Sequence, residues 1–341
     1  MARSSVARLL GDIGGTHARF AWQEAEGAAL RDIITLPCAA FPALADALTA
    51  YLHQVGRPAP PWCAIGIATP LTGDEVRMTN HPWAFSITAL QAEFGFERFV
   101  VINDFTALAL ALPDLGAHEL KQLGGGSPVA DAPMALIGPG TGLGVSGLLP
   151  RGEPGRWVAL QGEGGHVTLA PGNAREAAVL QLLRRDFGHA SAERAVSGPG
   201  LVALYAALCE LDGMAAAAPA GASEITARAL DGSNAQCVET LDLFCAFLGN
   251  VAGNLALTLG ARGGVYIGGG IVPRLGAAVE RSRLRACFED KGRFRSYLEP
   301  IPVFVIHASV SPALAGVARA LTRNKFRKSL ISLEVASSEI E

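Results

Sequence analysis

The sequence predicts an α/β protein of two domains. Its 341 residues give room for about two domains of ordinary size. Half of the residues are apolar and only 17% are charged, which supports a large buried core and excludes a disordered chain. Apolar runs typical of strands alternate with helical patterns, and one strand–turn–strand design occurs twice. This repeat indicates a duplicated architecture rather than one uniform sheet.

The two predicted hairpins share one plan. Each has an apolar strand, a glycine turn with a threonine and a second strand. In the first hairpin these are residues 8–13, 14–16 and 18–22, and in the second they are residues 134–137, 138–142 and 143–149. A third glycine cluster, Gly268-Gly269-Gly270, follows the apolar run 264–267 and precedes a predicted helix near Pro273.

Helices and strands alternate through the rest of the chain. The predicted helices are 41–52, 86–94, 106–112, 174–187, 200–211, 238–260 and one that Ser311-Pro312 opens, and the predicted strands are 62–67, 99–103 and 302–306. Pro113 and the glycine-rich loop 124–128 mark a domain boundary. The acidic, serine-rich segment 324–341 is expected to be a mobile tail.

Composition argues against nucleic acid and membrane partners. The 28 basic and 31 acidic residues give a net charge of −3, whereas nucleic acid and anionic membranes require a concentrated basic excess. The longest apolar stretch, 243–259, is interrupted by glycine and asparagine and is shorter than the about 20 residues of a membrane span, so we expect a core helix. The six cysteines form no CxxC pair, which indicates a reducing, cytoplasmic location.

The turn around Gly14-Gly15-Thr16 could hold a phosphate group. Its glycines have no Cβ to block a ligand, its backbone N–H groups can point at phosphate oxygens, and Asp12 beside it can hold Mg²⁺ through water. A plain hairpin turn would use the same residue types. The second glycine turn, with Thr141, favours the phosphate interpretation, because a nucleoside triphosphate must be held from two sides.

Two better-known phosphate motifs do not explain these glycines. The P-loop pattern GxxxxGK[ST] is absent. Gly142, Gly144 and Gly147 form a GxGxxG, but the proline- and glycine-rich residues 148–155 cannot form the helix that a Rossmann fold requires there. We therefore interpret this GxGxxG as a chance match.

Three polar clusters are candidates for chemistry on hydroxyl groups. Asp104 follows an apolar strand and could accept a proton from a substrate hydroxyl while Asn103 fixes a neighbouring one, although both residues also suit a helix cap. Glu163 and His166 are separated by two glycines, so they lie on a turning segment and could bind a polyhydroxyl ligand, or belong to a plain surface loop. Glu193 offers one more carboxylate for such a ligand, or is simply an exposed acidic residue at the end of a helix.

Taken in order along the chain, these motifs resemble those of bacterial ATP-dependent glucokinases, which are hexokinase-like members of the actin-like ATPase superfamily. The resemblance extends from Leu9 to about Leu321 and is carried by an ordered set of segments: 11–19, 78–83, 101–106, 140–144, 162–166, 191–194 and 268–273. It implies a two-domain actin-like (ribonuclease H-like) ATPase fold with an interdomain cleft. Since the last helix of such folds returns to the first domain, we expect domains at 1–113 with about 307–323 and at 114–306.

The resemblance also implies an activity, the transfer of the γ-phosphoryl group of ATP to the 6-hydroxyl of glucose. It makes Asp104 the catalytic base and Asn103, Asp104, Glu163, His166 and Glu193 the glucose-binding residues. It assigns ATP binding to Asp12, Gly14, Gly15, Thr16, Gly140, Thr141, Gly142, Gly268, Gly269 and Gly270, with Mg²⁺ held through ATP phosphates and water near Asp12. Members are usually homodimers.

The chain departs from the family pattern at His17, where asparagine is expected. The cysteine cluster that holds zinc in repressor-type relatives is absent after His166, so no structural zinc is expected. The alternatives that stay open are a kinase for another hexose and a non-catalytic sugar sensor on the same fold. The paired carboxylates Glu163 and Glu193 favour a neutral polyol over an anionic substrate, because like charges repel.

Overall fold

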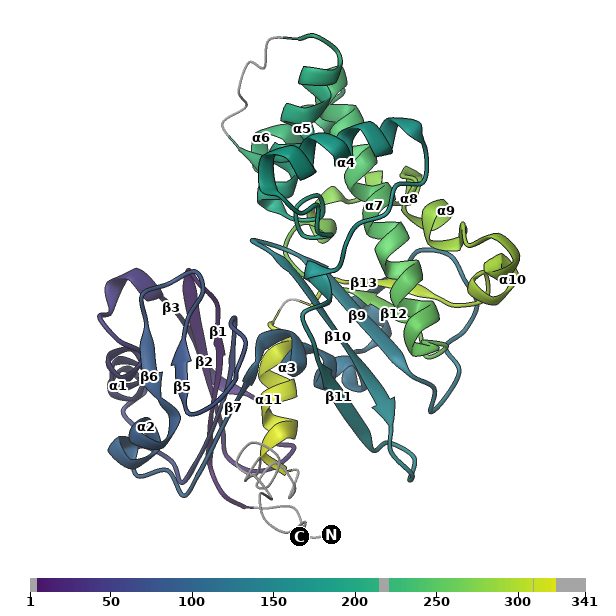
Figure 1. Ribbon diagram of the computed structural model, residues 1–341. Coiled ribbons are helices and arrows are strands. Elements are labelled where there is room, and N and C mark those ends of the chain that lie inside the picture. The colour runs from purple at the N-terminus through teal and green to yellow at the C-terminus, as the bar shows by residue number, and fades with distance from the viewer. Residues whose placement is uncertain (1–4, 215–220, 309, 323–341) are drawn as a thin grey trace, which may run out of the picture. The chain divides into compact units, whose positions relative to one another are not determined.

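The structure, a computed structural model, describes residues 5–214, 221–308 and 310–322 (Figure 1). It contains two compact units, one formed by the residues up to Ala111 together with the segment from Val310, and the other by Leu112–Ser309. The segment 324–341, expected to be a tail, lies outside the described residues.

The first unit is a mixed α/β structure. Its strands are β1 Arg8–Ile13, β2 His17–Gln23, β3 Arg31–Pro37, β4 Trp62–Ile67, β5 Glu75–Arg77, β6 Ala84–Ser86 and β7 Arg98–Asn103. Its helices are α1 Leu44–Val55, α2 Ile87–Phe94, α3 Asp104–Ala111 and α11 Pro312–Thr322.

The second unit follows the same α/β alternation with more helices. Its strands are β8 Leu120–Gln122, β9 Met134–Pro139, β10 Leu143–Pro150, β11 Trp157–Gln161, β12 Val265–Ile267 and β13 Val303–Ile306. Its helices are α4 Ala174–Phe187, α5 Gly198–Leu211, α6 Ala222–Leu230, α7 Ala235–Leu259, α8 Ala278–Arg281, α9 Leu284–Glu289 and α10 Arg295–Leu298. The helix predicted near Pro273 is a short 3-10 helix, Val272–Leu275, that ends at Gly276, whose φ is +56°.

The sheet of the first unit brings three strand ends to one edge. Its strand order is β3-β2-β1-β4-β7, and β1, β4 and β7 are parallel. Ile13 pairs with Ile67, and Ile67 pairs with Asn103, so the three strands end level with one another. The carboxyl ends of parallel strands are where α/β proteins place ligands, and this edge carries Asp12, Asn103 and Asp104.

Helices cover both faces of this sheet (Figure 1). On one face, α1 and α2 pack on a core that includes Leu9, Phe20 and Ile65. On the other face lie α3 and α11, which pack so closely that a Cβ on Gly316 of α11 would lie 1.7 Å from the carbonyl oxygen of Ala107 in α3. Only glycine permits this approach, so the contact fixes how the last described helix sits on the sheet.

The sheet of the second unit repeats part of this pattern. Its strand order is β11-β10-β9-β12-β13-β8, with β9 antiparallel to β10 and parallel to β12. In the first unit β1 is likewise antiparallel to β2 and parallel to β4. Both predicted hairpins are therefore confirmed. In each unit, the first strand of the hairpin is antiparallel to its hairpin partner and parallel to a later strand of the sheet.

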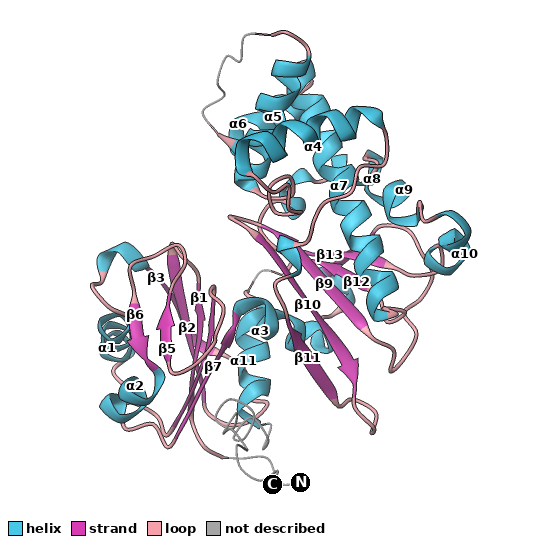
Figure 2. Cartoon of the chain, in the orientation of Figure 1, coloured by secondary structure: helices cyan, strands magenta, loops and turns pink. Residues whose placement is uncertain are grey.

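The long helix α7 connects the helical part of the second unit with its sheet (Figure 2). It contacts α5, α6 and α9 and reaches β9. Among the described residues it is the one helix long and apolar enough to cross a membrane, but 72% of its apolar window is buried inside the protein, as in many core helices. This burial agrees with the core helix expected from its glycine and asparagine residues.

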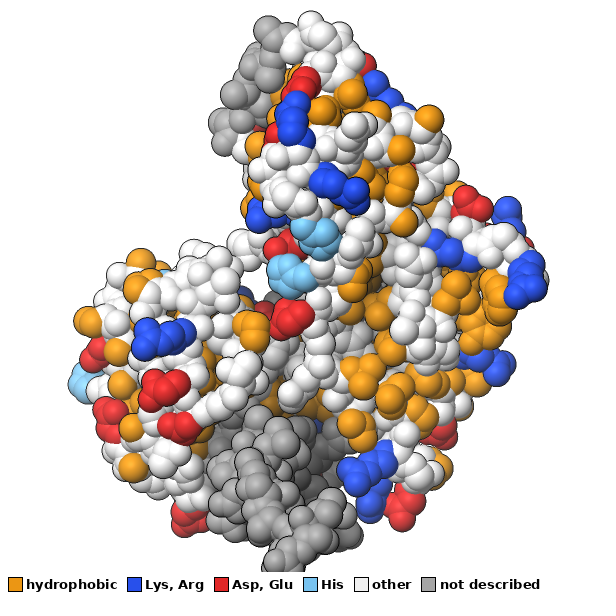
Figure 3. Space-filling model, in the orientation of Figure 1, with side chains coloured by type: hydrophobic (Ala, Val, Ile, Leu, Met, Phe, Trp, Pro, Cys, Tyr) orange, Lys and Arg blue, Asp and Glu red, His pale blue; other side chains and the backbone are white. Residues whose placement is uncertain are grey.

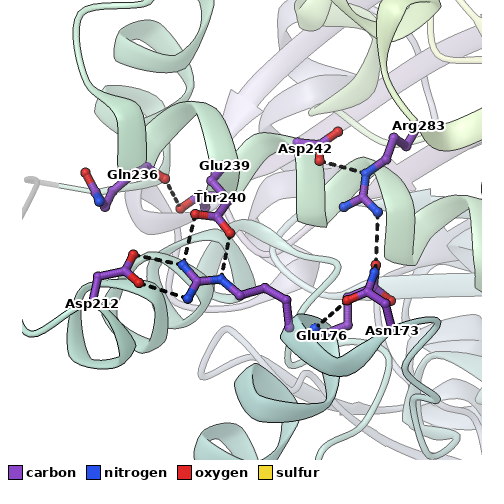
Figure 4. A network of polar contacts seen from close by, with 9 residues as sticks. Asn173, Glu176, Asp212, Gln236, Glu239, Thr240, Asp242 and Arg283 are labelled. Carbon is purple, nitrogen blue, oxygen red and sulfur yellow. Dashed lines mark hydrogen bonds and ion pairs between the residues drawn. The ribbon is translucent and has the colours of Figure 1, made fainter.

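Two ion-pair networks hold the start of α4 against neighbouring helices (Figure 4). Arg175 donates in bidentate fashion to Asp212 after α5, at 2.8 Å, and to Glu239 of α7. The buried Glu176 accepts from Arg283, which also donates to Asp242 of α7 at 2.7 Å. Bidentate guanidinium–carboxylate pairs are geometrically specific, so these networks fix α4, α5 and α7 relative to one another.

Candidate functional site

The glycine turn between β1 and β2 is closed by main-chain hydrogen bonds. Gly14 N–H donates to the carbonyl oxygen of His17 at 2.9 Å, and Cys38 N–H donates to that of Thr16 at 2.9 Å. The imidazole of His17 is exposed and takes no part in these bonds. Since any residue type provides the same carbonyl, the histidine at this position leaves the closing bond of the turn unchanged.

Asp12 lies at the end of β1 with only 19% of its side chain exposed. Its Oδ2 is 3.3 Å from Nη1 of Arg19, its cross-strand partner in β2. Burial raises the pKa of the Asp12 carboxyl above its usual range, an effect that a hydrogen bond from Ser311 and the charge of Arg19 oppose. Asp12 is thus a partly enclosed carboxylate beside a glycine turn.

Asn103 is a helix cap, as one of the two sequence interpretations expects. Its Oδ1 accepts hydrogen bonds from the N–H groups of Phe105 and Thr106, at 2.9 and 3.1 Å, which satisfies two free donors at the start of α3. Its Nδ2 donates to Oδ1 of Asp104 at 3.0 Å. The amide of Asn103 therefore both caps α3 and orients the carboxylate of Asp104.

Asp104 is the first residue of α3, at the end of β7. Its Oδ1 accepts from Asn103 and also from the N–H of Phe105 at 2.9 Å. Burial raises the pKa of Asp104 from 3.8 to about 6, and the negative charge of Asp12 adds to the effect. A carboxylate with a pKa close to working pH is a better proton acceptor than an ordinary aspartate.

The glycine turn of the second unit is held by residues that are distant in sequence. Gly140 N–H donates to the carbonyl of Gly142, and Gly198 N–H donates to the carbonyl of Gly140, both at 2.8 Å. The carboxylate of Glu193 accepts from the N–H of Leu143 at 2.8 Å. Thr141, between the two glycines, is exposed.

The third glycine cluster lies beside this turn. Gly268 N–H donates to the carbonyl of Ile137 in β9 at 2.8 Å. Gly269 has a φ of +77°, and a Cβ there would lie 2.3 Å from the carbonyl oxygen of Pro139. Gly269 and Gly270 are both exposed. In the second unit, the glycines that the sequence assigns to phosphate and to adenosine thus gather at the ends of β9 and β12.

Glu163, His166 and Glu193 are brought together by main-chain bonds. Glu163 and His166 are exposed; Glu163 directly precedes the 3-10 helix Gly164–His166, and His166 N–H at its end donates to the carbonyl of Glu163 at 3.0 Å. Glu193 N–H donates to the carbonyl of Gly165 at 2.8 Å. The segment carrying the first two side chains is therefore tied directly to the third.

The predicted residues fall into two groups, one in each unit. Asp12, Asn103 and Asp104 belong to the first unit, together with the turn Gly14–Thr16. The residues from Gly140 to Gly270 belong to the second. On the face in Figure 3, basic and acidic side chains of the described residues are interspersed.

Sequence reasoning missed two residues that act on Asp12. Arg19 lies opposite Asp12 in the β1–β2 register, and a tight hairpin centred on Gly14-Gly15 would have predicted this cross-strand pair. Ser311 reaches Asp12 from the segment before α11, and the local sequence holds no signal for that contact.

The residues present suit a magnesium ion carried by the nucleotide. Mg²⁺ keeps several waters and is usually held by one or two carboxylates plus substrate phosphates. Asp12 offers one partly enclosed carboxylate beside a glycine turn. Within residues 5–214, 221–308 and 310–322, no three or more His, Cys, Asp or Glu side chains group as a metal site. The donor set fits an ion that ATP brings and not a cage built by the protein alone.

A family model and several relatives match most of this chain. The glucokinase family model matches residues 9–324. The chain is 57% identical to a glucokinase of Chromobacterium violaceum over 311 residues, covering 91% of this chain and 88% of the relative. It is 55% identical to a glucokinase of Aromatoleum aromaticum over 315 residues, covering 92% and 94%.

A solved structure agrees with the sequence relatives. The crystal structure of a glucokinase from an Antarctic psychrotroph superposes with a TM-score of 0.83 at 34% identity, covering 93% of this chain and 99% of that one. The predicted actin-like ATPase fold is confirmed. The chain belongs to the glucokinase family.

Proposed function

We propose that this chain is a glucokinase that transfers the γ-phosphoryl group of ATP to the 6-hydroxyl of glucose, with Asp104 as general base. Membership of the glucokinase family supports the hexose kinase activity. The observation that carries the assignment of the base is the place of Asp104, at the strand edge that also holds Asp12, with a pKa of about 6.

The nucleotide would be held by backbone donors and by the ion it carries. The glycine turns at 14–16 and 140–142 lie at strand ends and leave room for phosphate oxygens, while 268–270 lies beside the second turn for the adenosine. Asp12 would hold Mg²⁺ through water. When bound, the ion neutralises charge that develops on the phosphate oxygens.

Glucose would be bound by groups that accept and donate hydrogen bonds. Glu163 and Glu193 offer carboxylate oxygens to hydroxyl groups, and His166 lies on the same segment as Glu163. The amide of Asn103 uses its carbonyl as a cap and one N–H for Oδ1 of Asp104 at 3.0 Å, and its other N–H makes only a 3.5 Å bond to the carbonyl of Thr69. That N–H is the donor we propose for a sugar hydroxyl.

Asp104 would take the proton of the 6-hydroxyl as the new P–O bond forms. Phosphoryl transfer passes through a loose transition state, so the proton leaves late, after the oxygen has become acidic. With a pKa of about 6, Asp104 is mostly ionised at pH 7 and ready to accept it. The hydrogen bonds from Asn103 and Phe105 to Oδ1 hold the carboxylate in one orientation.

Further parts of the proposal follow from the family. We propose a requirement for Mg²⁺, a homodimer and a cytoplasmic location, with glucose 6-phosphate as the product that enters glycolysis.

One assay tests the central proposal. The protein is incubated with Mg-ATP and a panel of hexoses, and both ADP and sugar phosphate are followed. We expect equal amounts of ADP and sugar phosphate with glucose. The matched variant Asp104→Ala should lose turnover by about 10²–10⁴-fold, the range of a general base, while still binding glucose. ADP without sugar phosphate, or full activity of that variant, would contradict the proposal.

A further inference from the structure

Glu193 contacts the phosphate turn as well as lying among the sugar residues. Its Oε2 accepts a hydrogen bond from the N–H of Leu143, at 2.8 Å, directly after the turn Gly140–Gly142. The two residues are 50 positions apart in the sequence. The carboxylate thus bridges two segments that the proposed function assigns to different substrates.

The main chain around Glu193 is tied to both segments. Its N–H donates to the carbonyl of Gly165, between Glu163 and His166, at 2.8 Å. Its own carbonyl accepts from Oγ of Ser197 at 2.7 Å, and the N–H of Gly198 donates to the carbonyl of Gly140 at 2.8 Å. Residues 193–198 therefore connect the sugar segment to the turn by backbone as well as by side chain.

The two carboxylate oxygens of Glu193 are not equivalent. A Cβ at Gly142 would lie 2.5 Å from Oε2 but 4.0 Å from Oε1. Oε2 is pressed against the turn and occupied by Leu143, whereas Oε1 lies farther from the turn. One carboxylate can accept hydrogen bonds at both oxygens, so Oε1 is the oxygen open to a sugar hydroxyl.

We propose that Glu193 couples the two substrate sites. The inference rests on the proposed function and adds a second role to a glucose-binding residue. A glucose hydroxyl that donates to Oε1 fixes the side chain in the rotamer in which Oε2 holds Leu143. Glucose thereby orders the turn Gly140–Gly142, and ATP binds to a turn that is already ordered. Coupling of this kind is reciprocal, so ATP must strengthen glucose binding by the same factor.

Glu163 provides a matched control for this role. It is the other proposed sugar carboxylate, but in the part of the chain that the structure describes its side chain makes no hydrogen bond to the turn 140–142. Loss of the Glu163 carboxylate should weaken glucose binding without changing the coupling. A comparison of Glu163 and Glu193 variants therefore separates an effect on glucose affinity from an effect on the coupling between the glucose and ATP sites.

The test measures a binding cycle. The dissociation constant of AMP-PNP with Mg²⁺ is determined by calorimetry with and without saturating glucose, and the ratio is the coupling factor. We expect a factor of about 5 or more in the native chain, at the lower end of allosteric couplings, and about 1 in Glu193→Ala. The control Glu163→Ala should keep the native factor at saturating glucose.

Two further variants keep the test decisive if Glu193→Ala fails to fold. Glu193→Gln retains an oxygen for Leu143 N–H, so AMP-PNP affinity without glucose should stay native although glucose affinity falls. Gly142→Ala leaves Glu193 intact but adds a methyl group 2.5 Å from Oε2, so it should lose the coupling. In leucine-labelled protein, glucose alone should shift the amide NMR signal of Leu143.

The outcomes distinguish the inference from the proposed function. Native coupling in both Glu193→Ala and Gly142→Ala, or an unmoved Leu143 signal on glucose binding, would overturn the coupling role while leaving the kinase intact. Absence of glucose phosphorylation by the native chain would instead overturn the proposed function itself.

Discussion

Replacing Asp104 by asparagine should abolish activity and stabilise the protein. Asparagine has nearly the same shape, and its side-chain oxygen can still accept the hydrogen bonds that Asn103 and Phe105 donate to Oδ1. The change removes the charge without removing these bonds. It therefore isolates the energetic cost of keeping an ionised carboxylate at this place.

The cost follows from the pKa of the folded protein. Asp104 titrates at about 6 when folded against 3.8 as the reference value, because burial and Asp12 disfavour its charged form. The stabilisation that a bound proton gives is complete below the unfolded pKa and is lost as pH rises through the folded one. Above pH 6 the charge thus costs at most about 3 kcal/mol, and Asp104→Asn should recover about 1–3 kcal/mol of that.

Urea denaturation of both proteins at two pH values measures this gain. At pH 7.5 the variant should be the more stable one, and its advantage should be smaller at pH 5 by about 1 kcal/mol, since most of the native Asp104 is then protonated. A variant that is less stable at pH 7.5, or whose advantage does not change with pH, would refute the reasoning. Retained kinase activity would separately refute the role of Asp104 as base.

Three further predictions address the site and the fold. The kcat of the native chain should fall about tenfold per pH unit below pH 6 as Asp104 takes up one proton, and a flat profile between pH 5 and 8 would exclude it as the base. Glu163→Gln should raise the KM for glucose about tenfold with little change in kcat, as expected for one charged hydrogen bond, and an unchanged KM in steady-state assays would count against its role. Gly316→Ala should lower the free energy of unfolding by about 1–3 kcal/mol through overpacking on Ala107, whereas Gly73→Ala, where a Cβ meets no atom within 4 Å, should leave it unchanged.

Local sequence patterns predicted the elements that carry the site. The strand ending at Asn103, the turns at 14–16 and 140–142 and the helix α4 all lie where their apolar patterns and glycines indicate. Strands that lack such patterns were not predicted: β3 is mostly exposed, and β5, β6 and β8 are only three residues long. A short or exposed strand depends on its neighbours for stability, and the local sequence does not report them.

The candidate site was predicted residue by residue, but its connections were not. Asn103 and Asp104 were open to two interpretations, and the structure shows Asn103 as a cap that also orients Asp104. The bond from Leu143 to Glu193 spans 50 positions, and no local pattern encodes such a contact. Residue types at strand ends and turns could be read from the sequence, whereas pairings across the fold required coordinates.

The position of α11 has a consequence for biosynthesis. Synthesis proceeds from the N-terminus, so the whole of the second unit, Leu112–Ser309, is synthesised before Pro312. Until then the sheet face that bears Gly66 is covered by Ala107 of α3 but lacks Val317 of α11, which also packs there. The first unit, although its translation begins first, therefore completes its fold only when α11 has been made, and a nascent chain without α11 would expose part of this apolar face to chaperones.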